Sequence, residues 1–407
     1  MYNIFKKYDQ HIERAQYKTF LPVNNSQLNT PNKTITFRID CMDDFLNIAN
    51  TKFFIYGRYL QKDGKDYPKG TKIQLIDNFV AYLFSNIIVK KNGKVLDECE
   101  YVGITSTIKG VVSYLVDQNG PTINSGFASK FEGGGYFNAM GKLSQFGLGF
   151  FKDVKCPVFK GDMEIIFTRN TDDDALLKKV ITGTEDGKII IEEFTLQIPI
   201  IEYGVHKVLL INELTKLSQE KLYTFIFRSW QNIEERNISG KTIKLDLSNQ
   251  NRSSNSPKFA GVVFQTNKLN TQDHDPCEFD HCNVKNYWFE INGKRYPEET
   301  QDLDFKNDKF CVAYESLMEY KRNYLKNHQE HPLMYNNPND FKKFRAIYLV
   351  NLSRQPTNIS ATKKNIILHV DLNEELPKNT ICYVFFVRED EFLFDIEKGT
   401  IEESFSD

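Results

Sequence analysis

Apolar and polar residues alternate in many short segments along the chain. Ile35, Phe37 and Ile39 alternate with polar residues, and Ile243 and Leu245 do the same further along. A period of two residues is typical of a β-strand with one buried face. The same pattern, or a short run rich in β-branched and aromatic residues, predicts further strands at residues 53–60, 87–91, 95–98, 188–199, 223–230, 259–266, 287–291, 344–351 and 380–388.

Helical spacing of apolar residues is confined to a few segments. Residues 104–116 and 310–325 each place apolar side chains three and four positions apart, which predicts an amphipathic helix in both. Shorter helices are predicted at residues 78–85 and 211–217. Helices are therefore a minority in a chain that consists mainly of strands.

Two long segments, residues 117–141 and 326–340, show neither period. Loops of this length in a compact domain are usually functional or mobile. We expect both to be irregular surface loops, either functional or simple excursions of the chain.

The tripeptide Asn-Gly-Lys occurs twice, at residues 92–94 and 292–294, and its surroundings recur in the same order. Upstream, residues 36–40 resemble residues 242–246 at an offset of 206; downstream, a helix follows each tripeptide and a later pair of strands recurs at an offset near 201. Asn-Gly between apolar runs is typical of a two-residue hairpin turn. Four matches in order indicate a tandem duplication of one β domain.

The duplication divides the chain near residue 210. We expect an N-terminal arm at residues 1–20, a first jelly roll at 21–208 and a second at 209–407. Each half is long enough to bury its own core. The predicted fold class is all-β: two tandem antiparallel jelly-roll sandwiches with a few short helices.

Composition and charge limit the expected partners and compartment of the protein, but they do not indicate a reaction. The 407 residues are 40% hydrophobic and 13% aromatic, and the formal charge is -2, so the whole-chain charge does not indicate nucleic acid or anionic membrane as the main partner. Seven cysteines without a framework spacing favour a reducing compartment. No apolar run approaches the ~20 residues that span a bilayer. We expect a soluble protein made inside a cell.

Candidate chemistry is weak. His274, Cys277, His281 and Cys282 have the ligand types of a zinc site, but adjacent His281 and Cys282 suit a tetrahedral site poorly and no second ligand pair follows. The glycines of 133–135 and Gly141-Lys142 lack the spacing of a phosphate loop, and the acidic run 172–174 suits a solvated turn better than a cation site. We predict no catalytic, cofactor-binding or metal site, and no enzyme.

The order of segments in the first half resembles a known family. An Asn-Phe-x-x-x-Leu-Phe-Ser segment leads directly into a strand that ends at Asn-Gly-Lys, as in the double jelly-roll major capsid proteins of Maverick/Polinton elements, virophages and adenovirus-like insect-associated elements. The residues that carry the resemblance are Asn78, Phe79, Leu83, Phe84, Ser85, Asn92, Gly93 and Lys94.

This resemblance implies a structural function. In the family, three chains form a homotrimer with a pseudo-hexagonal outline, and trimers tile an icosahedral shell. It implies a virion location with assembly in the host cytoplasm or nucleus, minor or penton capsid proteins as partners, and no small-molecule substrate or cofactor. The N-terminal arm, with Lys6, Lys7, Arg14 and Lys18, would face packaged DNA or a membrane.

Two other functions fit the same pattern. Peptide-N-glycosidases also carry two jelly rolls in one chain, and their carboxylates cannot be identified from spacing. A tandem β-sandwich binding module, including a capsid protein adopted by a host, is the second alternative. Neither is expected to assemble into shells.

Overall fold

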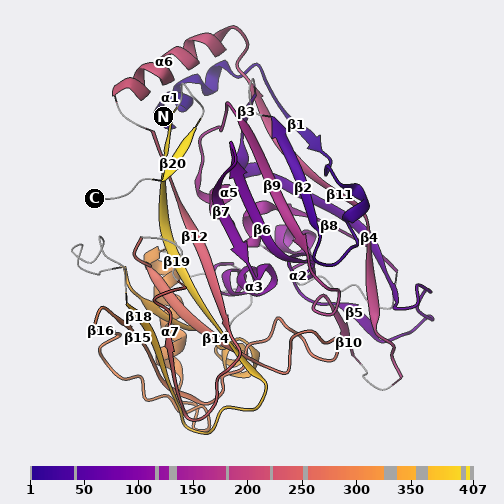
Figure 1. Ribbon diagram of the computed structural model, residues 1–407, viewed down its shortest axis with the longest axis vertical. Coiled ribbons are helices and arrows are strands. Elements are labelled where there is room, and N and C mark those ends of the chain that lie inside the picture. The colour runs from indigo at the N-terminus through magenta and orange to yellow at the C-terminus, as the bar shows by residue number, and fades with distance from the viewer. Residues whose placement is uncertain are drawn as a thin grey trace. The chain divides into compact units, whose positions relative to one another are not determined.

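The computed structural model describes residues 2–40, 44–114, 119–127, 135–179, 183–220, 223–250, 255–324, 337–353, 365–395 and 400–403. Much of the two predicted loops, residues 128–134 and 326–336, lies outside the described residues, as do Gly133 and Gly134. Figure 1 shows the arrangement of strands and helices.

The chain forms two compact units. Unit 1 consists of Met1–Gly103, Asn124–Ser229 and Asp390–Phe405, and unit 2 contains Ile104–Ile123 and Trp230–Glu389. A segment from the first half of the sequence, beginning at Ile104, therefore belongs to the unit that the second half builds. The boundaries that we predict at residues 20 and 208 stay predictions.

Unit 1 contains two antiparallel sheets of the sandwich and one short strand pair. The first sheet has the order β1-β11-β4-β8, with β3 also paired to β11, and the second has the order β2-β9-β6-β7. The first consists of β1 (Arg14–Phe20), β11 (Gly187–Glu202), β4 (Lys52–Gln61), β8 (Gly135–Lys142) and β3 (Phe45–Leu46). The second consists of β2 (Thr34–Asp40), β9 (Asp162–Arg169), β6 (Phe84–Lys91) and β7 (Lys94–Glu100), and the short pair is β5 (Ile73–Leu75) with β10 (Leu176–Lys178).

The second repeat has the same two strand orders. One sheet runs β13-β18-β15-β16 and the other β12-β19-β14-β17, with β20 paired to β19. The first consists of β13 (Thr242–Asp246), β18 (Ile366–Leu372), β15 (Val284–Ile291) and β16 (Lys294–Tyr296). The second consists of β12 (Tyr223–Glu235), β19 (Thr380–Phe394), β14 (Phe259–Thr266), β17 (Tyr348–Asn351) and β20 (Ile401–Glu403). Identical strand order in both repeats confirms the predicted duplication.

Alternation of apolar residues builds both cores. In β2, Ile35, Phe37 and Ile39 are buried while their neighbours face outward. The Phe37 ring meets that of Phe194 on the facing sheet at 5.1 Å in an edge-to-face arrangement. Such contacts between the inner faces of two sheets are what a period-two pattern produces when a sandwich closes.

Both Asn-Gly pairs form the expected hairpin turn. Asn92 and Gly93 have φ of 48° and 78°, and Asn292 and Gly293 have φ of 48° and 79°. Two consecutive residues at positive φ define the type I′ turn, which matches the twist of the strands on either side. The turns join β6 to β7 and β15 to β16.

The side chains of these turns are also equivalent. Asn92 Oδ1 accepts a hydrogen bond from the Asp162 amide at 2.8 Å, and Asn292 Oδ1 accepts one from the Asn365 amide at 2.9 Å. The two turn asparagines, Asn92 and Asn292, are thus 200 residues apart, and their amide partners, Asp162 and Asn365, are 203 residues apart. Asp40 pairs with Asp162, and Ser248 contacts Asn365. Ser248 is therefore the equivalent of Asp40, and the repeat offset between β2 and β13 is 208. This offset is two residues more than the sequence comparison predicts, so the same face of the strand is buried.

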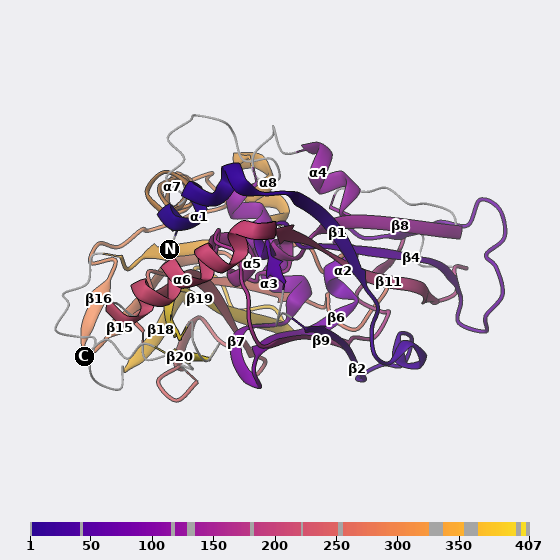
Figure 2. The ribbon, with the colours of Figure 1, turned by 90° about the horizontal axis from the view of Figure 1, so that it is seen from above.

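The principal helices lie where helical spacing predicts them. They are α3 (Val102–Ser113), α6 (Lys207–Glu220) and α7 (Cys311–Glu319), the last followed by a π-helical turn at Tyr320–Tyr324. The shorter helices are α1 (Tyr2–Tyr8), α2 (Phe79–Tyr82), α4 (Asn119–Asn124), α5 (Phe150–Asp153) and α8 (Pro338–Phe344). Figure 2 shows α1 alongside α6.

Three predicted boundaries are wrong. The helix expected at residues 78–85 is the single turn α2, because Phe84 and Ser85 already belong to β6. The strand expected from residue 344 begins at Tyr348, after α8 ends. The segment 117–141, expected to be a loop, contains α4 and most of β8, which pairs with β4 along its length.

Candidate functional site

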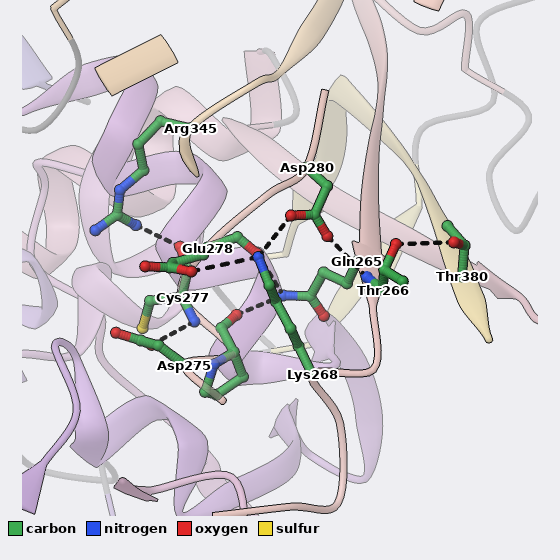
Figure 3. Close-up of polar contacts among 10 residues, drawn as sticks. Gln265, Thr266, Lys268, Asp275, Cys277, Glu278, Asp280, Arg345 and Thr380 are labelled. Carbon is green, nitrogen blue, oxygen red and sulfur yellow. Dashed lines mark hydrogen bonds and ion pairs between the residues drawn. The ribbon is translucent and has the colours of Figure 1, made fainter. Parts of the chain in front are cut away.

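The four residues considered as metal ligands lie in the connection between β14 and β15 of unit 2. Figure 3 shows the polar network around one of them, Cys277. Lys268 Nζ lies 2.8 Å from Asp280 Oδ1 and 3.4 Å from Glu278 Oε2. Gln265 Nε2 donates to the Glu278 carbonyl at 3.2 Å, and Arg345 donates to the Cys277 carbonyl. These contacts hold the backbone of the connection in place, so the network is structural.

Two thiols and the imidazole of this connection are packed against the interior of the unit. Cys277 and Cys282 are buried, and burial raises the pKa of the Cys282 thiol to about 12. The His281 ring stacks on Phe305 at 4.4 Å, and burial lowers the pKa of His281. Among the described residues, which include His274, no group of three or more His, Cys, Asp or Glu side chains could hold a metal ion.

The other candidate segments make contacts within the fold where they are described. Asp172 accepts a hydrogen bond from the buried Arg169 guanidinium. Gly141 and Lys142 lie in β8, a strand, whereas a phosphate loop needs backbone amides gathered before a helix. The Lys142 ammonium donates to Asn50 Oδ1 at 2.9 Å.

The N-terminal segment is attached to unit 1. Phe5 of α1 is buried, and its ring lies 6.1 Å from Phe45 and 6.5 Å from Tyr203. Lys7 forms an exposed ion pair with Glu213 of α6 at 2.6 Å. Strand β1 then pairs with β11 along all seven of its residues. Lys6, Arg14 and Lys18 stay exposed on this segment.

Several exposed apolar side chains of the described residues lie close together in the sequence. Val205, which is 80% exposed, is followed on α6 by the exposed Val208 and Leu209. Leu21 and Val23, just after β1, are 64% and 54% exposed, and Val312 is a single exposed apolar residue on α7, at 59%. Contiguous exposed apolar surface marks contact sites between proteins. The sequence contains a signal for this surface: residues 208–211 of α6 are all apolar. A helix on a protein surface buries one stripe, so some of four successive apolar residues must be exposed.

We name the two sheets that contain the Asn-Gly turns, β2-β9-β6-β7 and β13-β18-β15-β16, the hairpin sheets. Their outward faces differ between the repeats. In unit 2, Trp288 of β15 stacks on His369 of β18 at 4.8 Å, and the Arg295 guanidinium lies 4.1 Å from the Trp288 ring. The offsets of 200 and 203 place Ile88, Val95 and Ile166 at these positions in unit 1. Periodicity did not single out this stack, because it identifies an outward position but not the neighbours on adjacent strands.

No helix in the described ranges is both long and apolar enough to cross a membrane.

Comparison with known proteins agrees with this architecture. Residues 73–391 match the family model of the double jelly roll-like domain. The chain is similar in structure to VP54 of the virus PBCV-1, solved as a fit into a reconstruction of the virophage Sputnik, at a TM-score of 0.58 and 9% identity over 97% of each chain. It is also similar to the faustovirus major capsid protein, at a TM-score of 0.55 and 11% identity over 93% of this chain and 90% of that one.

The mavirus major capsid protein is a third similar structure, at a TM-score of 0.52 and 13% identity over 96% of this chain and 90% of that one. No curated protein matches the chain. At these identities the structures show the fold, and the family model covers most of the sequence. The predicted pair of antiparallel jelly rolls with a few short helices is confirmed. The chain belongs to the double jelly roll-like domain family.

Proposed function

We propose that this chain is a major capsid protein that acts by self-assembly and not by catalysis. The observation that carries the proposal is the extent of the structural similarity to viral capsid proteins: 97% of this chain matches 97% of the PBCV-1 protein. Both chains therefore consist almost wholly of the same two jelly rolls.

The duplicated fold supports a homotrimer as the building block. Three copies of a chain with two similar sandwiches present six similar sandwiches around one axis, which gives a threefold object a pseudo-hexagonal outline. A contact between unlike surfaces of successive copies closes into a ring when the rotation between them is 120°. Such trimers tile an icosahedral shell.

The N-terminal segment is the proposed inner contact. Lys6, Arg14 and Lys18 are exposed on α1 and β1, and basic side chains there suit DNA phosphates or anionic lipid head groups. Minor or penton capsid proteins are the further proposed partners. The proposed location is the virion, after assembly in the host cytoplasm or nucleus, and a Polinton-like element is the proposed source.

Negative-stain electron microscopy of the purified chain tests the proposal. We expect particles with a hexagonal outline and, at raised concentration, curved sheets or closed shells. A field of single 47.4 kDa particles across all concentrations and salts would instead favour the monomeric binding module or the glycosidase.

A further inference from the structure

Helices α3 and α7 hold the same place in the two repeats. Each follows the second strand of an Asn-Gly hairpin, α3 after β7 and α7 after β16. Their surroundings nevertheless differ, and the difference carries an inference about assembly.

Helix α3 is buried on every side. All of its twelve residues are buried, including the consecutive Thr105, Ser106 and Thr107, each of which has a polar partner. From Ile104 onward it belongs to unit 2, together with the second repeat. Within that unit, Asn232 Nδ2 of β12 donates to Thr105 Oγ1 at 3.3 Å, and Thr107 Oγ1 lies 4.0 Å from the Cys277 sulfur. The first repeat thus supplies a buried helix whose residues from Ile104 onward belong to unit 2 and bond to it.

Helix α7 is covered on one side alone. Of its nine residues, Ala313 and Leu317 are buried, whereas Cys311, Val312 and Glu315 are exposed. Residues three and four positions apart share a helix face, so these exposed side chains form one continuous surface. Val312 is the apolar residue of this surface, and it is 59% exposed.

Strand β12, which α3 contacts, also has an equivalent strand in unit 1. Strand β12 holds the place in its sheet that β1 holds in unit 1. The part of β12 in unit 2 is buried at Trp230, Asn232 and Ile233, the middle one being the Thr105 partner. In unit 1, six of the seven residues of β1 are exposed, and so are the apolar Leu21 and Val23 just after it.

We propose that α7 of one copy packs on the Leu21–Val23 segment of a second copy, in the way that α3 packs within unit 2. We name the exposed side of α7 the donor face and the Leu21–Val23 segment the acceptor face. The occupant is a second copy because the chain carries both faces, each has exposed apolar side chains (Val312 on one, Leu21 and Val23 on the other), and the covered version of the same contact already exists in unit 2. Unlike faces on the two repeats give a head-to-tail contact, which three copies close. This inference rests on the proposed trimer.

Disulfide trapping tests the contact. Cys311 lies on the donor face and is the exposed cysteine among those in the described ranges. Leu21→Cys and Val23→Cys are made separately, with Cys41→Ser in each variant because Cys41 lies outside the described residues. Copper phenanthroline with oxygen takes two electrons and two protons from a pair of thiols to form the disulfide.

We expect covalent dimers and trimers on non-reducing gels from at least one of these variants, and single chains after reduction or after adding Cys311→Ser. The matched control is Ile226→Cys, which is expected to stay a single chain: Ile226 lies on β12 outside both faces and is 57% exposed, close to the 64% of Leu21 and the 54% of Val23.

A second pair of variants measures the strength of the contact. Val312→Glu places a charge on the donor face, and Ile226→Glu places one at an apolar position of β12 outside both faces. The two side chains are 59% and 57% exposed, so both variants are expected to fold. We expect association at least ten-fold weaker for Val312→Glu and unchanged for Ile226→Glu.

The outcomes separate this inference from the function on which it rests. A wild-type mass of three chains without Cys311-dependent cross-linking, or with equal effects of the two glutamates, would overturn the contact and leave the capsid proposal standing. A wild-type mass of one chain would overturn both.

Discussion

The two hairpin sheets share a framework and differ in what they present to their surroundings. Sheet β2-β9-β6-β7 and sheet β13-β18-β15-β16 have the same strand order and the same Asn-Gly turn. Their inward positions are mostly apolar in both repeats, but the first sheet also buries the charged Lys91, Asp97 and Arg169. The position equivalent to Lys91 in the second repeat is Ile291, at an offset of 200. Their outward positions carry Ile88 and Ile166 in one and Trp288 and His369 in the other.

This difference shows which residues hold the fold and which specify contacts. Positions that face the core or shape a turn are constrained in the same way in each repeat, because each sandwich must close on its own interior. Outward positions are under no such constraint. Two copies of one domain within a chain can therefore meet different neighbours while keeping one architecture.

The largest expected effect comes from a shared feature of the framework, a glycine in each of two equivalent strands. A Cβ on Gly57 of β4 would lie 2.2 Å from the Ile190 carbonyl oxygen, and one on Gly261 of β14 would lie 2.3 Å from the Phe385 ring. We expect Gly57→Val and Gly261→Val each to lower the free energy of unfolding by more than about 3 kcal/mol, as a lower urea midpoint or loss of soluble protein. In Gly93→Ala the Cβ meets no atom within 4 Å but keeps a φ of 78°, so the loss should be about 1 kcal/mol. Equal losses at Gly57 and Gly93 would contradict this explanation.

The next largest loss of stability is expected from removing the ion pair between Asp153 and Arg228 in unit 1. Asp153 accepts hydrogen bonds from the Arg228 amide and Nε at 3.0 and 2.8 Å. Burial by itself raises the pKa of Asp153, but the hydrogen bonds and charge of Arg228 outweigh it and hold the pKa below its ordinary value. The unfolded chain therefore takes up the proton at a higher pH than the folded chain. Stability from this pair is complete above about pH 4 and is lost as the pH falls further.

Asp153→Asn should cost about 2 kcal/mol at pH 7, because it leaves a largely buried guanidinium without its charge partner. Urea titrations at pH 7 and pH 3 check this: the difference between wild type and variant should shrink at the lower pH. A constant difference would show that the carboxylate charge is not what stabilises the fold.

The two turn asparagines test the equivalence of the repeats directly. Asn92→Ala and Asn292→Ala each remove one side-chain hydrogen bond to a backbone amide and place alanine at a φ of 48°. We expect a loss of about 1.5 kcal/mol from each, and the double variant should show the sum, since the sites share no partner. Asn→Gly at either site keeps the turn but loses the bond, so it should cost less. A loss confined to one repeat would contradict the equivalence.

The smallest expected effect is on the outward faces. Trp288→Ile gives unit 2 the residue that unit 1 has at this position, and removes the stacking with Arg295 and His369. We expect a loss of about 1 kcal/mol in unfolding free energy, the size of one partly exposed cation–π contact. Ile88→Val in unit 1 is the matched control, with a smaller change. A collapse of the fold in Trp288→Ile would mean that this face has a structural role that unit 1 lacks.

The sequence was sufficient for most strands, both turns and the duplication, because each follows from local spacing. The errors have local causes as well. Residues 135–141 contain two glycines and fall in a predicted loop, yet they form most of β8. Gly141 is needed in this strand because a Cβ there would lie 2.4 Å from the Ser125 Cβ. Helix α8 was missed, although Asn337 caps it by accepting hydrogen bonds from two amides at 3.0 Å and Pro338 follows at its first position.

The candidate contact faces could not be predicted in the same way. Val312 and Ile108 both lie in helices with apolar spacing, but Val312 is exposed and Ile108 is buried. Which side of a helix is covered depends on segments far away in the sequence, such as the β14–β15 connection around Cys277. Periodicity contains no information about those neighbours.

The central claim is that two equivalent sandwiches in one chain serve a threefold assembly. Multi-angle light scattering of the purified chain tests it most directly. The account predicts a mass three times the 47.4 kDa of one chain, or a larger multiple of that trimer. A stable mass of one chain at micromolar concentration would contradict it.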